Sequence, residues 1–253
     1  GTTLTGTNLL MVTNSYGAEG SYTVSLTVSN SSGQIYTLIQ TNYVTIGGNY
    51  YASIYGDNTT YTNWTTAAVD IQTAVNAATP GSIVWVADQQ LFGITNPISI
   101  TKPIQVRSQS ADWQASTTII YRATSLVQRV FYINHPKAVV DGFIITNGLG
   151  NANSITNYGG AVALVQGTLR NCLLTLNHAY NGGAVMLFDG TVSNCVLTDN
   201  LADSQGGGVY LIGGNVVKSR IEYNRANGSE GGGVYMVGGY IRNSTICTNY
   251  AAG

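Results

Sequence analysis

The chain carries little charge. Only 8% of its 253 residues are Asp, Glu, Lys or Arg, whereas an ordinary soluble domain has roughly 25%. Its net charge of −1 leaves no basic stripe, which argues against nucleic acid or an anionic membrane surface as a partner. Solubility must come from neutral polar side chains, and a surface rich in Asn, Thr and Tyr but poor in Lys is typical of secreted β proteins. We therefore expect an extracellular or cell-surface protein.

Long apolar runs and a cysteine framework are also missing. No apolar run approaches the roughly 18 residues that a membrane-spanning helix needs, so we predict no membrane-spanning segment. Three cysteines are too few for a disulfide framework. Cys172 and Cys195 hold equivalent positions in successive repeats, which would place their backbones about 4.8 Å apart. They form either a disulfide or two buried thiols, and we expect Cys247 to be unpaired.

What the sequence does contain is one unit of about two dozen residues written four times, starting at Gly159, Gly182, Gly206 and Gly231. The spacings of 23, 24 and 25 residues are typical of a stacked solenoid. Apolar residues alternate within each copy as they do on short strands. Five aligned sets should point inward: Val162, Val185, Val209 and Val234; Leu164, Leu187, Leu211 and Met236; Leu169, Val192, Val216 and Ile241; Cys172, Cys195, Ser219 and Ser244; Leu174, Leu197, Ile221 and Ile246. Three strands per copy, in register from copy to copy, predict an all-β parallel β-helix.

Two elements of the repeat carry a family resemblance. GGAV opens the copies at Gly159 and Gly182, and NCxxTxN spans residues 171–177 and 194–200. They resemble the repeats of polymorphic outer-membrane proteins and related right-handed β-helix proteins of bacterial surfaces, within the pectate-lyase-like superfamily. The resemblance implies a right-handed coil. The recurring Asn177, Asn200, Asn224 and Asn249 close the third strand of each copy, and we expect them to form a structural ladder.

Upstream of the repeats, residues 63–80 predict one amphipathic helix. Ile71, Ala74, Val75 and Ala78 form its apolar stripe. Thr65 or Thr66 would cap its start, and Pro80 with Gly81 would end it. This order resembles the opening of pectate-lyase-like β-helices, where a short helix caps the N-terminal end of the coil.

The N-terminal residues follow a different pattern. Residues 20–30 and 41–46 alternate strongly and resemble the closing strands of a polycystic-kidney-disease (PKD) type β-sandwich, whose Trp-Asp-Phe-Gly-Asp-Gly signature is absent. We therefore predict two units: residues 1–47 as the C-terminal part of a PKD-like sandwich, and residues 48–253 as the β-helix, with regular repeats from 159.

No catalytic constellation emerges from the acidic residues. Lyases and hydrolases on this fold need clustered carboxylates, with calcium or as an acid–base pair, so we predict no catalytic residue, metal site or cofactor. Arg220 with Glu222 is the best candidate, although a surface ion pair explains it as well. His135, Lys137 and Asp141 form a short polar cluster, and we interpret His178 as an exposed loop residue.

An outward apolar stripe is the predicted binding surface. By parity, one column holds Ala163, Met186, Tyr210 and Tyr235, and its neighbour holds Val165, Phe188, Ile212 and Val237. We predict Met186, Phe188, Tyr210, Ile212 and Tyr235 as binding residues. The occupant could be the N-terminal strands, another protein chain, sugar rings stacked on the tyrosines, or a long loop of the same chain.

These observations favour a non-catalytic extracellular structural or adhesive module that self-assembles into filaments through stacked or swapped β elements. The repeat series stops where a fifth Gly-Gly would begin, so we expect an open rung covered by more chain or another subunit. A carbohydrate-active enzyme, either a polysaccharide lyase or a hydrolase, and a carbohydrate-binding module are the alternatives. Possible partners are therefore a second copy, another surface protein or a polysaccharide.

Overall fold

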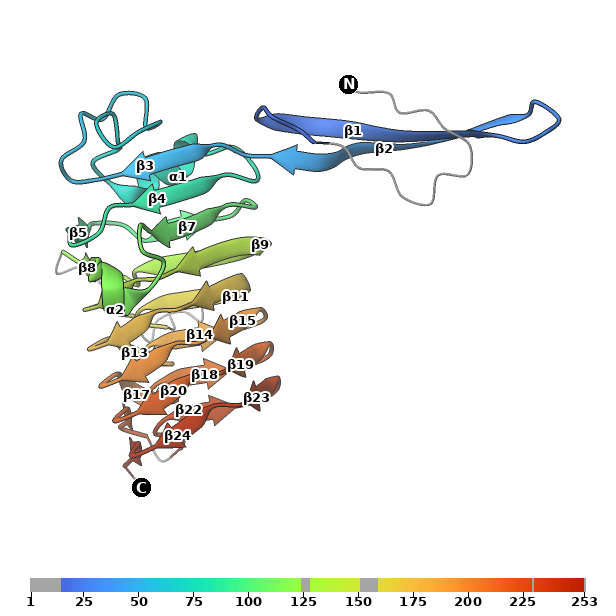
Figure 1. Cartoon of the computed structure of the whole chain (residues 1–253). Coiled ribbons are helices and arrows are strands. Elements are labelled where there is room, and N and C mark those ends of the chain that lie inside the picture. Colours follow the sequence, from blue (N-terminus) through green and yellow to red (C-terminus); the bar gives the residue numbers. More distant parts are fainter. Residues whose placement is uncertain (1–14, 124–127, 151–158, 229, 253) are drawn as a thin grey trace.

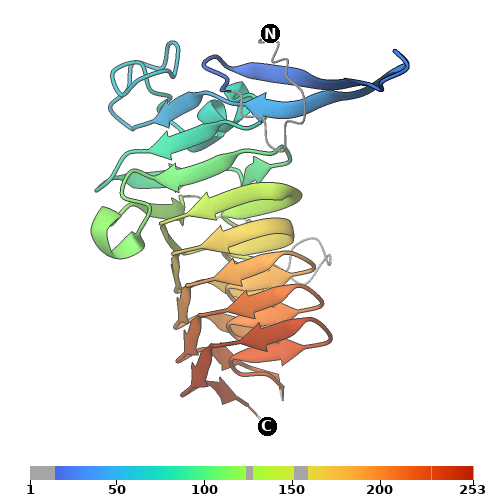
Figure 2. The ribbon, with the colours of Figure 1, turned by 45° about the vertical axis from the view of Figure 1, so that its right-hand side comes forward.

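The computed structural model describes residues 15–123, 128–150, 159–228 and 230–252. It shows a stack of parallel coils with very little helix (Figures 1 and 2), which confirms the predicted all-β parallel solenoid. The largest sheet runs along the whole stack through eight strands: β3 (Asn49–Ala52), β4 (Ile83–Val86), β7 (Gln105–Ser108), β9 (Phe131–Asp141), β11 (Val162–Arg170), β14 (Val185–Leu187), β18 (Val209–Leu211) and β22 (Val234–Met236). Four further strands join this sheet beside that path: β6 (Ile98–Ile100), β15 (Thr191–Ser193), β19 (Asn215–Val217) and β23 (Tyr240–Arg242).

Two smaller parallel sheets close the coils. One contains β5 (Leu91–Ile94), β8 (Ile119–Arg122), β10 (Ile144–Thr146), β12 (Leu173–Thr175), β16 (Val196–Thr198), β20 (Arg220–Glu222) and β24 (Thr245–Cys247). The other contains β13 (His178–Asn181), β17 (Leu201–Gln205), β21 (Arg225–Ala226) and β25 (Tyr250–Ala251). This last sheet adds a fourth strand to each repeat, where the sequence predicted three. Its inward residues are Ala179, Ala202 and Ala226, which are buried but too small to give a clear alternation.

The core of the solenoid is formed by the predicted inward sets. Val185 pairs in register with Val162 on one side and Val209 on the other, and all three are buried. Because parallel strands repeat every coil at about 4.8 Å, each apolar side chain stacks on its equivalent in the next coil. In the last coil, Met236 and Ile246 of the same sets are exposed.

The predicted asparagine ladder is confirmed. The Nδ2 of Asn200 donates to the carbonyl oxygens of Leu174 and Thr198 at 3.0 and 2.9 Å, and to the Oδ1 of Asn224 at 2.9 Å. Its Oδ1 accepts from the backbone N–H of Asn177 at 3.1 Å. Each side-chain amide thus forms hydrogen bonds with buried backbone N–H and carbonyl groups of neighbouring coils, which have no partner within the sheets.

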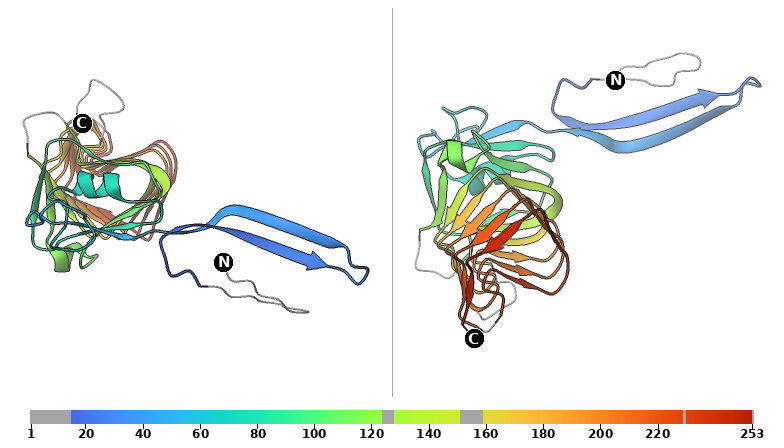
Figure 3. Two further views of the ribbon diagram at one scale, coloured as in Figure 1. Left: turned by 90° about the horizontal axis from the view of Figure 1, so that it is seen from above. Right: turned by 60° about the horizontal axis from the view of Figure 1, so that its bottom comes forward.

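Helix α1 (Ile71–Ala77) lies at the N-terminal end of the stack. Seen from above, it lies across the outline of the coils (Figure 3), with Ile71, Ala74 and Val75 buried. The helix begins later than predicted, because Asp70 rather than Thr65 or Thr66 caps it by accepting from the N–H of Thr73 at 2.8 Å. At the other end, the Nζ of Lys102 donates to the carbonyl oxygens of Asn76 and Ala78, which suits a cation at a helix C-terminus. That helix α1 caps the N-terminal end of the solenoid stays a prediction.

A second short helix, α2 (Trp113–Ser116), packs beside the coil that carries β9. Asp112 caps it by accepting from the N–H of Gln114, and the Oγ of Ser116 donates to the carbonyl oxygen of Gly142 at 3.1 Å.

The N-terminal segment forms a two-stranded antiparallel ribbon. Strands β1 (Gly20–Ser29) and β2 (Ile35–Ile46) pair along their length and project away from the coil stack (Figures 1 and 3). The connecting turn is ordered by Asn30, whose Oδ1 accepts from the N–H groups of Ser32 and Gln34. The strand predicted at residues 20–30 is confirmed, whereas the second strand begins at Ile35, before the predicted start at Thr41. Their assignment to a PKD-like unit stays a prediction.

Candidate functional site

The predicted apolar stripe lies on the outer face of β14, β18 and β22. Tyr210 pairs in register with Tyr235 of the next coil, and their rings stack with centroids 5.0 Å apart and planes 29° apart. Both tyrosines are half-buried, as are Phe188 and Ile212. Met186 is different: its exposed fraction is 0%. The expectation that Met186 contacts a ligand at the surface is therefore wrong for the folded chain.

The reason is positional. Ala163, the equivalent of Met186 in the preceding coil, is also fully buried, so the stripe is covered at its N-terminal end and accessible further along. Parity assigns a side chain to the outer face of a strand, but it does not tell whether another part of the chain lies over that face. What remains accessible is the surface formed by Phe188, Tyr210, Ile212 and Tyr235.

A charged cluster that the sequence did not reveal lies on the same sheet, on three neighbouring strands. Asp141 at the end of β9 pairs in register with Arg107 of β7 and Arg170 of β11. Its Oδ2 lies 3.1 Å from the Nε of Arg107 and 2.9 Å from an Nη of Arg170. Its Oδ1 accepts from the Nδ2 of Asn171 at 2.7 Å. The carboxylate is completely buried, while both arginine side chains are partly exposed.

The proposed polar cluster of His135, Lys137 and Asp141 is therefore wrong as a unit. The Nδ1 of His135 accepts from the N–H of Lys137 two residues further along β9, whereas Asp141 contacts the arginines of the adjacent coils. One signal was available: Asp141 and Arg170 hold equivalent positions, each directly after the inward residues Val140 and Leu169.

An aromatic ring extends the cluster toward the N-terminal end. The guanidinium carbon of Arg107 lies 5.3 Å from the ring centroid of Trp85, which is its neighbour in register. The Nε1 of Trp85 donates to the Oδ1 of Asn49 at 2.8 Å. Chemically, this row joins an indole, two guanidinium groups and one fully engaged carboxylate, so Asp141 is not available as a free base.

Two further polar pairs, one hydrogen bond and one ion pair, involve residues considered from the sequence. His178 lies in β13 rather than in a loop, and its Nε2 is 2.8 Å from the Oδ1 of Asp203. Arg220 and Glu222 form the expected surface pair on β20, with 3.0 Å between Nε and Oε1. Neither pair is joined by a second carboxylate: within the described residues, no group of three or more His, Cys, Asp and Glu side chains is placed to hold a metal ion.

Burial changes the proton affinity of a few groups. Desolvation lowers the pKa of Arg129 to about 10, partly offset by the charge of Tyr132. It also lowers the pKa of Lys102. Cys172 and Cys195 are free, buried thiols, and Cys247 is exposed. Desolvation is the main cause that raises the pKa of Cys172 well above its ordinary value, and the hydrogen bond of its thiol to Cys195 and the charge of Cys195 act in the same direction. A thiol in this state is a poor nucleophile, which fits a packing role.

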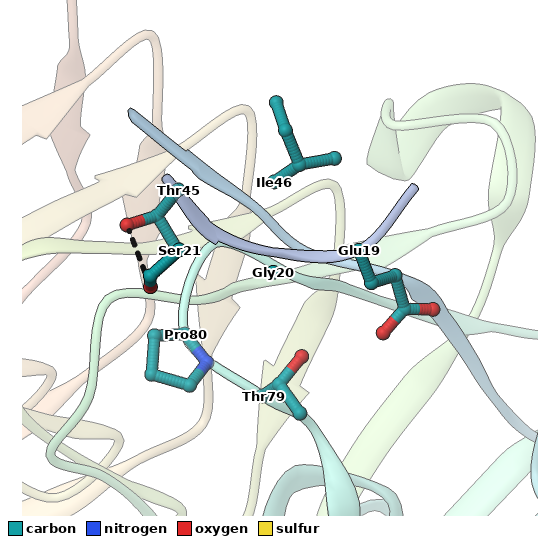
Figure 4. A pocket seen from close by; sticks show the side chains of 7 residues that line it. All are labelled: Glu19, Gly20, Ser21, Thr45, Ile46, Thr79 and Pro80. Atoms are coloured by element: carbon teal, nitrogen blue, oxygen red, sulfur yellow. Dashed lines mark hydrogen bonds between the residues drawn. The ribbon is translucent and has the colours of Figure 1, made fainter. Parts of the chain in front are cut away.

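A shallow pocket of about 230 Å³ lies where the ribbon meets the solenoid. Figure 4 shows its lining of Glu19, Gly20, Ser21, Thr45, Ile46, Thr79 and Pro80. The hydroxyls of Ser21 and Thr45 lie 3.4 Å apart at its wall. Glu19 is its one ionisable side chain, so the pocket holds no acid–base pair.

Comparison with known proteins identifies the fold. No protein-family model and no curated protein matches the chain. Among solved structures, a crystal structure of the pectate lyase Pel9A is similar, with a TM-score of 0.53 and 17% sequence identity over 82% of this chain. The chain spans about 56% of the length of that lyase. The likeness supports the parallel β-solenoid fold of this chain. In addition, the described part of the chain has no helix long and apolar enough to cross a membrane.

Proposed function

We propose that this chain is a non-catalytic structural and adhesive module of the extracellular space or cell surface, and that it associates with itself through exposed β elements. The carrying observation is the β1–β2 ribbon, which projects from the solenoid with Leu26, Leu38 and Ile39 exposed. Large exposed apolar patches on soluble proteins mark interaction sites. Unpaired strand edges offer further hydrogen-bonding groups to a partner.

The acidic side chains support a structural role. Ten of the eleven acidic residues accept a hydrogen bond or ion pair from a nearby group of the same chain. A general base or metal ligand needs a carboxylate oriented toward substrate or ion, whereas these carboxylates orient turns, helix starts and neighbouring coils. The proposed surface location and the PKD-like and outer-membrane-protein-type resemblances fit the same role.

Sedimentation velocity and negative-stain electron microscopy test this proposal. We expect concentration-dependent oligomers or fibres at ~1 to ~100 µM. Monodisperse monomers across that range, together with release of unsaturated or reducing sugar from a panel of acidic polysaccharides, would contradict it.

A second candidate is the binding or cleavage of a polysaccharide. It is favoured by the stacked Tyr210 and Tyr235, which form a flat aromatic surface suited to sugar rings, and by the likeness to a structure titled as a pectate lyase. Glycan-array binding that is lost in Tyr210→Ala and Tyr235→Ala, but kept in the exposed control Tyr223→Ala, would support binding. If the chain cleaves polysaccharide, the rate at which unsaturated or reducing sugar is formed should fall in the Arg220→Ala variant.

A further inference from the structure

The β1–β2 ribbon has two chemically different faces. Residues opposite each other in an antiparallel pair share a face, and so do every second residue along a strand. Leu26 lies opposite Leu38, and Val28 lies opposite Tyr36. The apolar face of the projecting part, hereafter the ribbon face, contains Tyr22, Val24, Leu26, Val28, Tyr36, Leu38 and Val44, with Gln40 as the one polar residue among its paired positions.

The opposite face is mainly hydroxylic. The Oγ1 atoms of Thr27 and Thr37 lie 3.0 Å apart across the strands, and Ser25 and Ser29 lie on the same side. Ile35, Ile39 and Tyr43 are its large apolar or aromatic residues. This division between an apolar and a polar face is the pattern of a sheet that packs one side against a second sheet.

The outer part of the ribbon face is open to solvent, whereas Tyr22, Val24 and Val44 are half-buried. Leu26 is 60% exposed and Leu38 is 58% exposed, and Val28 and Tyr36 are exposed as well. A two-stranded sheet with no covering layer is marginally stable in water. Some surface must therefore pack on this face for the ribbon to keep its shape.

We propose that the occupant is the ribbon face of a second copy of this chain, and that two ribbons pack face to face as a four-stranded, two-layer sandwich. This inference rests on the proposed self-association and names its surface. A face that contacts its own equivalent gives a two-fold dimer, which closes on itself. The two solenoids then extend outward from a shared central sandwich.

Charge and area favour a second copy. Residues 20–46 contain no charged side chain, so two ribbon faces meet without like-charge repulsion, and no charge selects a different partner. The four exposed apolar side chains present on the order of 100 Å² each and the three half-buried ones roughly 40 Å² each, which gives about 500 Å² per chain. Two copies would then bury ~1,000 Å², which reaches the lower limit for a specific interface.

Edge-to-edge pairing of ribbons is the competing arrangement, and the strands oppose it. The pairing shifts register between Tyr22 and Val24, where Asn42 of β2 adopts a φ of 52°. A bulge of this kind twists the strand and interrupts the regular row of hydrogen-bonding groups that another strand would need.

The experiment compares two double variants of matched exposure on opposite faces. Leu26→Ser with Leu38→Ser alters the ribbon face, and Ile35→Ser with Ile39→Ser alters the hydroxylic face, where the isoleucines are 68% and 60% exposed. Sedimentation equilibrium gives the dimer constant of each, and circular dichroism with thermal unfolding checks the fold. We expect the wild-type protein to have a molecular mass in solution of twice the 26.7 kDa of one chain. The dissociation constant of the dimer should rise at least tenfold in the Leu26→Ser, Leu38→Ser variant. In the Ile35→Ser, Ile39→Ser variant it should stay within about threefold of the wild-type value.

Three outcomes would overturn the inference. Equal weakening by both variants would indicate edge pairing or unspecific association. Oligomers unaffected by either variant would leave the proposed function standing but place the contact elsewhere. A monomeric wild type whose melting temperature falls only in the Leu26→Ser, Leu38→Ser variant would show that another segment of the same chain covers the face, and the self-association proposal would fail with it.

Discussion

Arg170 on β11 donates through its Nε to the Oδ2 of Asp141 on β9 at 2.9 Å. Arg107 approaches the same oxygen from β7, so one carboxylate joins three strands that lie side by side. Because Asp141 is completely buried, its charge depends on these two guanidinium groups for stabilisation. The cluster thus ties the irregular upper coils to the first regular repeat.

Asp141→Asn should lower the free energy of unfolding by about 3 kcal/mol, because it leaves two arginines without their shared counter-charge. Chemical denaturation measures this. The control is Glu222→Gln, which removes the partner of the exposed Arg220 and should cost less than about 1 kcal/mol. Similar losses in both variants would show that the buried carboxylate contributes no more than a surface pair.

Asn200→Ala should destabilise the solenoid by about 3 kcal/mol. The substitution removes the donors to Leu174 and Thr198 and leaves buried backbone carbonyl groups without a partner. Asn249→Ala is the matched control, since Asn249 makes the same kind of bonds to Ile221 and Cys247 but is only half-buried. Asn249→Ala should lower the free energy of unfolding by about 1 kcal/mol. A larger decrease in Asn249→Ala than in Asn200→Ala would argue against burial as the cause of the difference.

The raised pKa of Cys172 predicts a loss of stability at alkaline pH. Above the ordinary thiol pKa of about 8.5, the unfolded chain releases the proton while the folded chain keeps it, so the free energy of unfolding falls as pH rises. The slope from this one group can reach about 1.4 kcal/mol per pH unit.

Cys172→Ser tests this effect, because serine already occupies the equivalent positions Ser219 and Ser244. Denaturation curves between pH 8 and pH 10 should show a shallower decline for the variant than for wild type. Parallel declines would mean that other groups, such as the tyrosines, account for the whole effect.

Gly207→Ala should be strongly destabilising, by about 3 kcal/mol or more. A Cβ at Gly207 would lie 2.2 Å from the carbonyl oxygen of Gly232 in the next coil, and backbone atoms cannot move aside without breaking the stack. Gly17→Ala is the control, since nothing lies within 4 Å of its added Cβ, and it should change stability by less than about 0.5 kcal/mol. A folded, wild-type-like Gly207→Ala variant would show that the coil spacing is adjustable.

The predicted functional residues had mixed outcomes for physical reasons. Tyr210 and Tyr235 are stacked on the outer face, as strand parity and copy alignment predict. Met186 obeys the same parity but is buried, because accessibility depends on what lies above a strand. The cap of α1 was misplaced because Asp70 and Thr65 both suit an N-cap, and only the path of the chain between residues 53 and 70 selects one.

The sequence by itself determined the repeat, the inward sets and the asparagine ladder, because each depends on a local period that recurs at every coil. The tertiary structure alone decided the Asp141 cluster, the burial of Met186 and the exposure of the ribbon face. These depend on the alignment of coils of unequal length and on which surfaces other segments cover. A side chain's face follows from its neighbours along the strand, whereas its partner is set by the register between strands far apart in sequence.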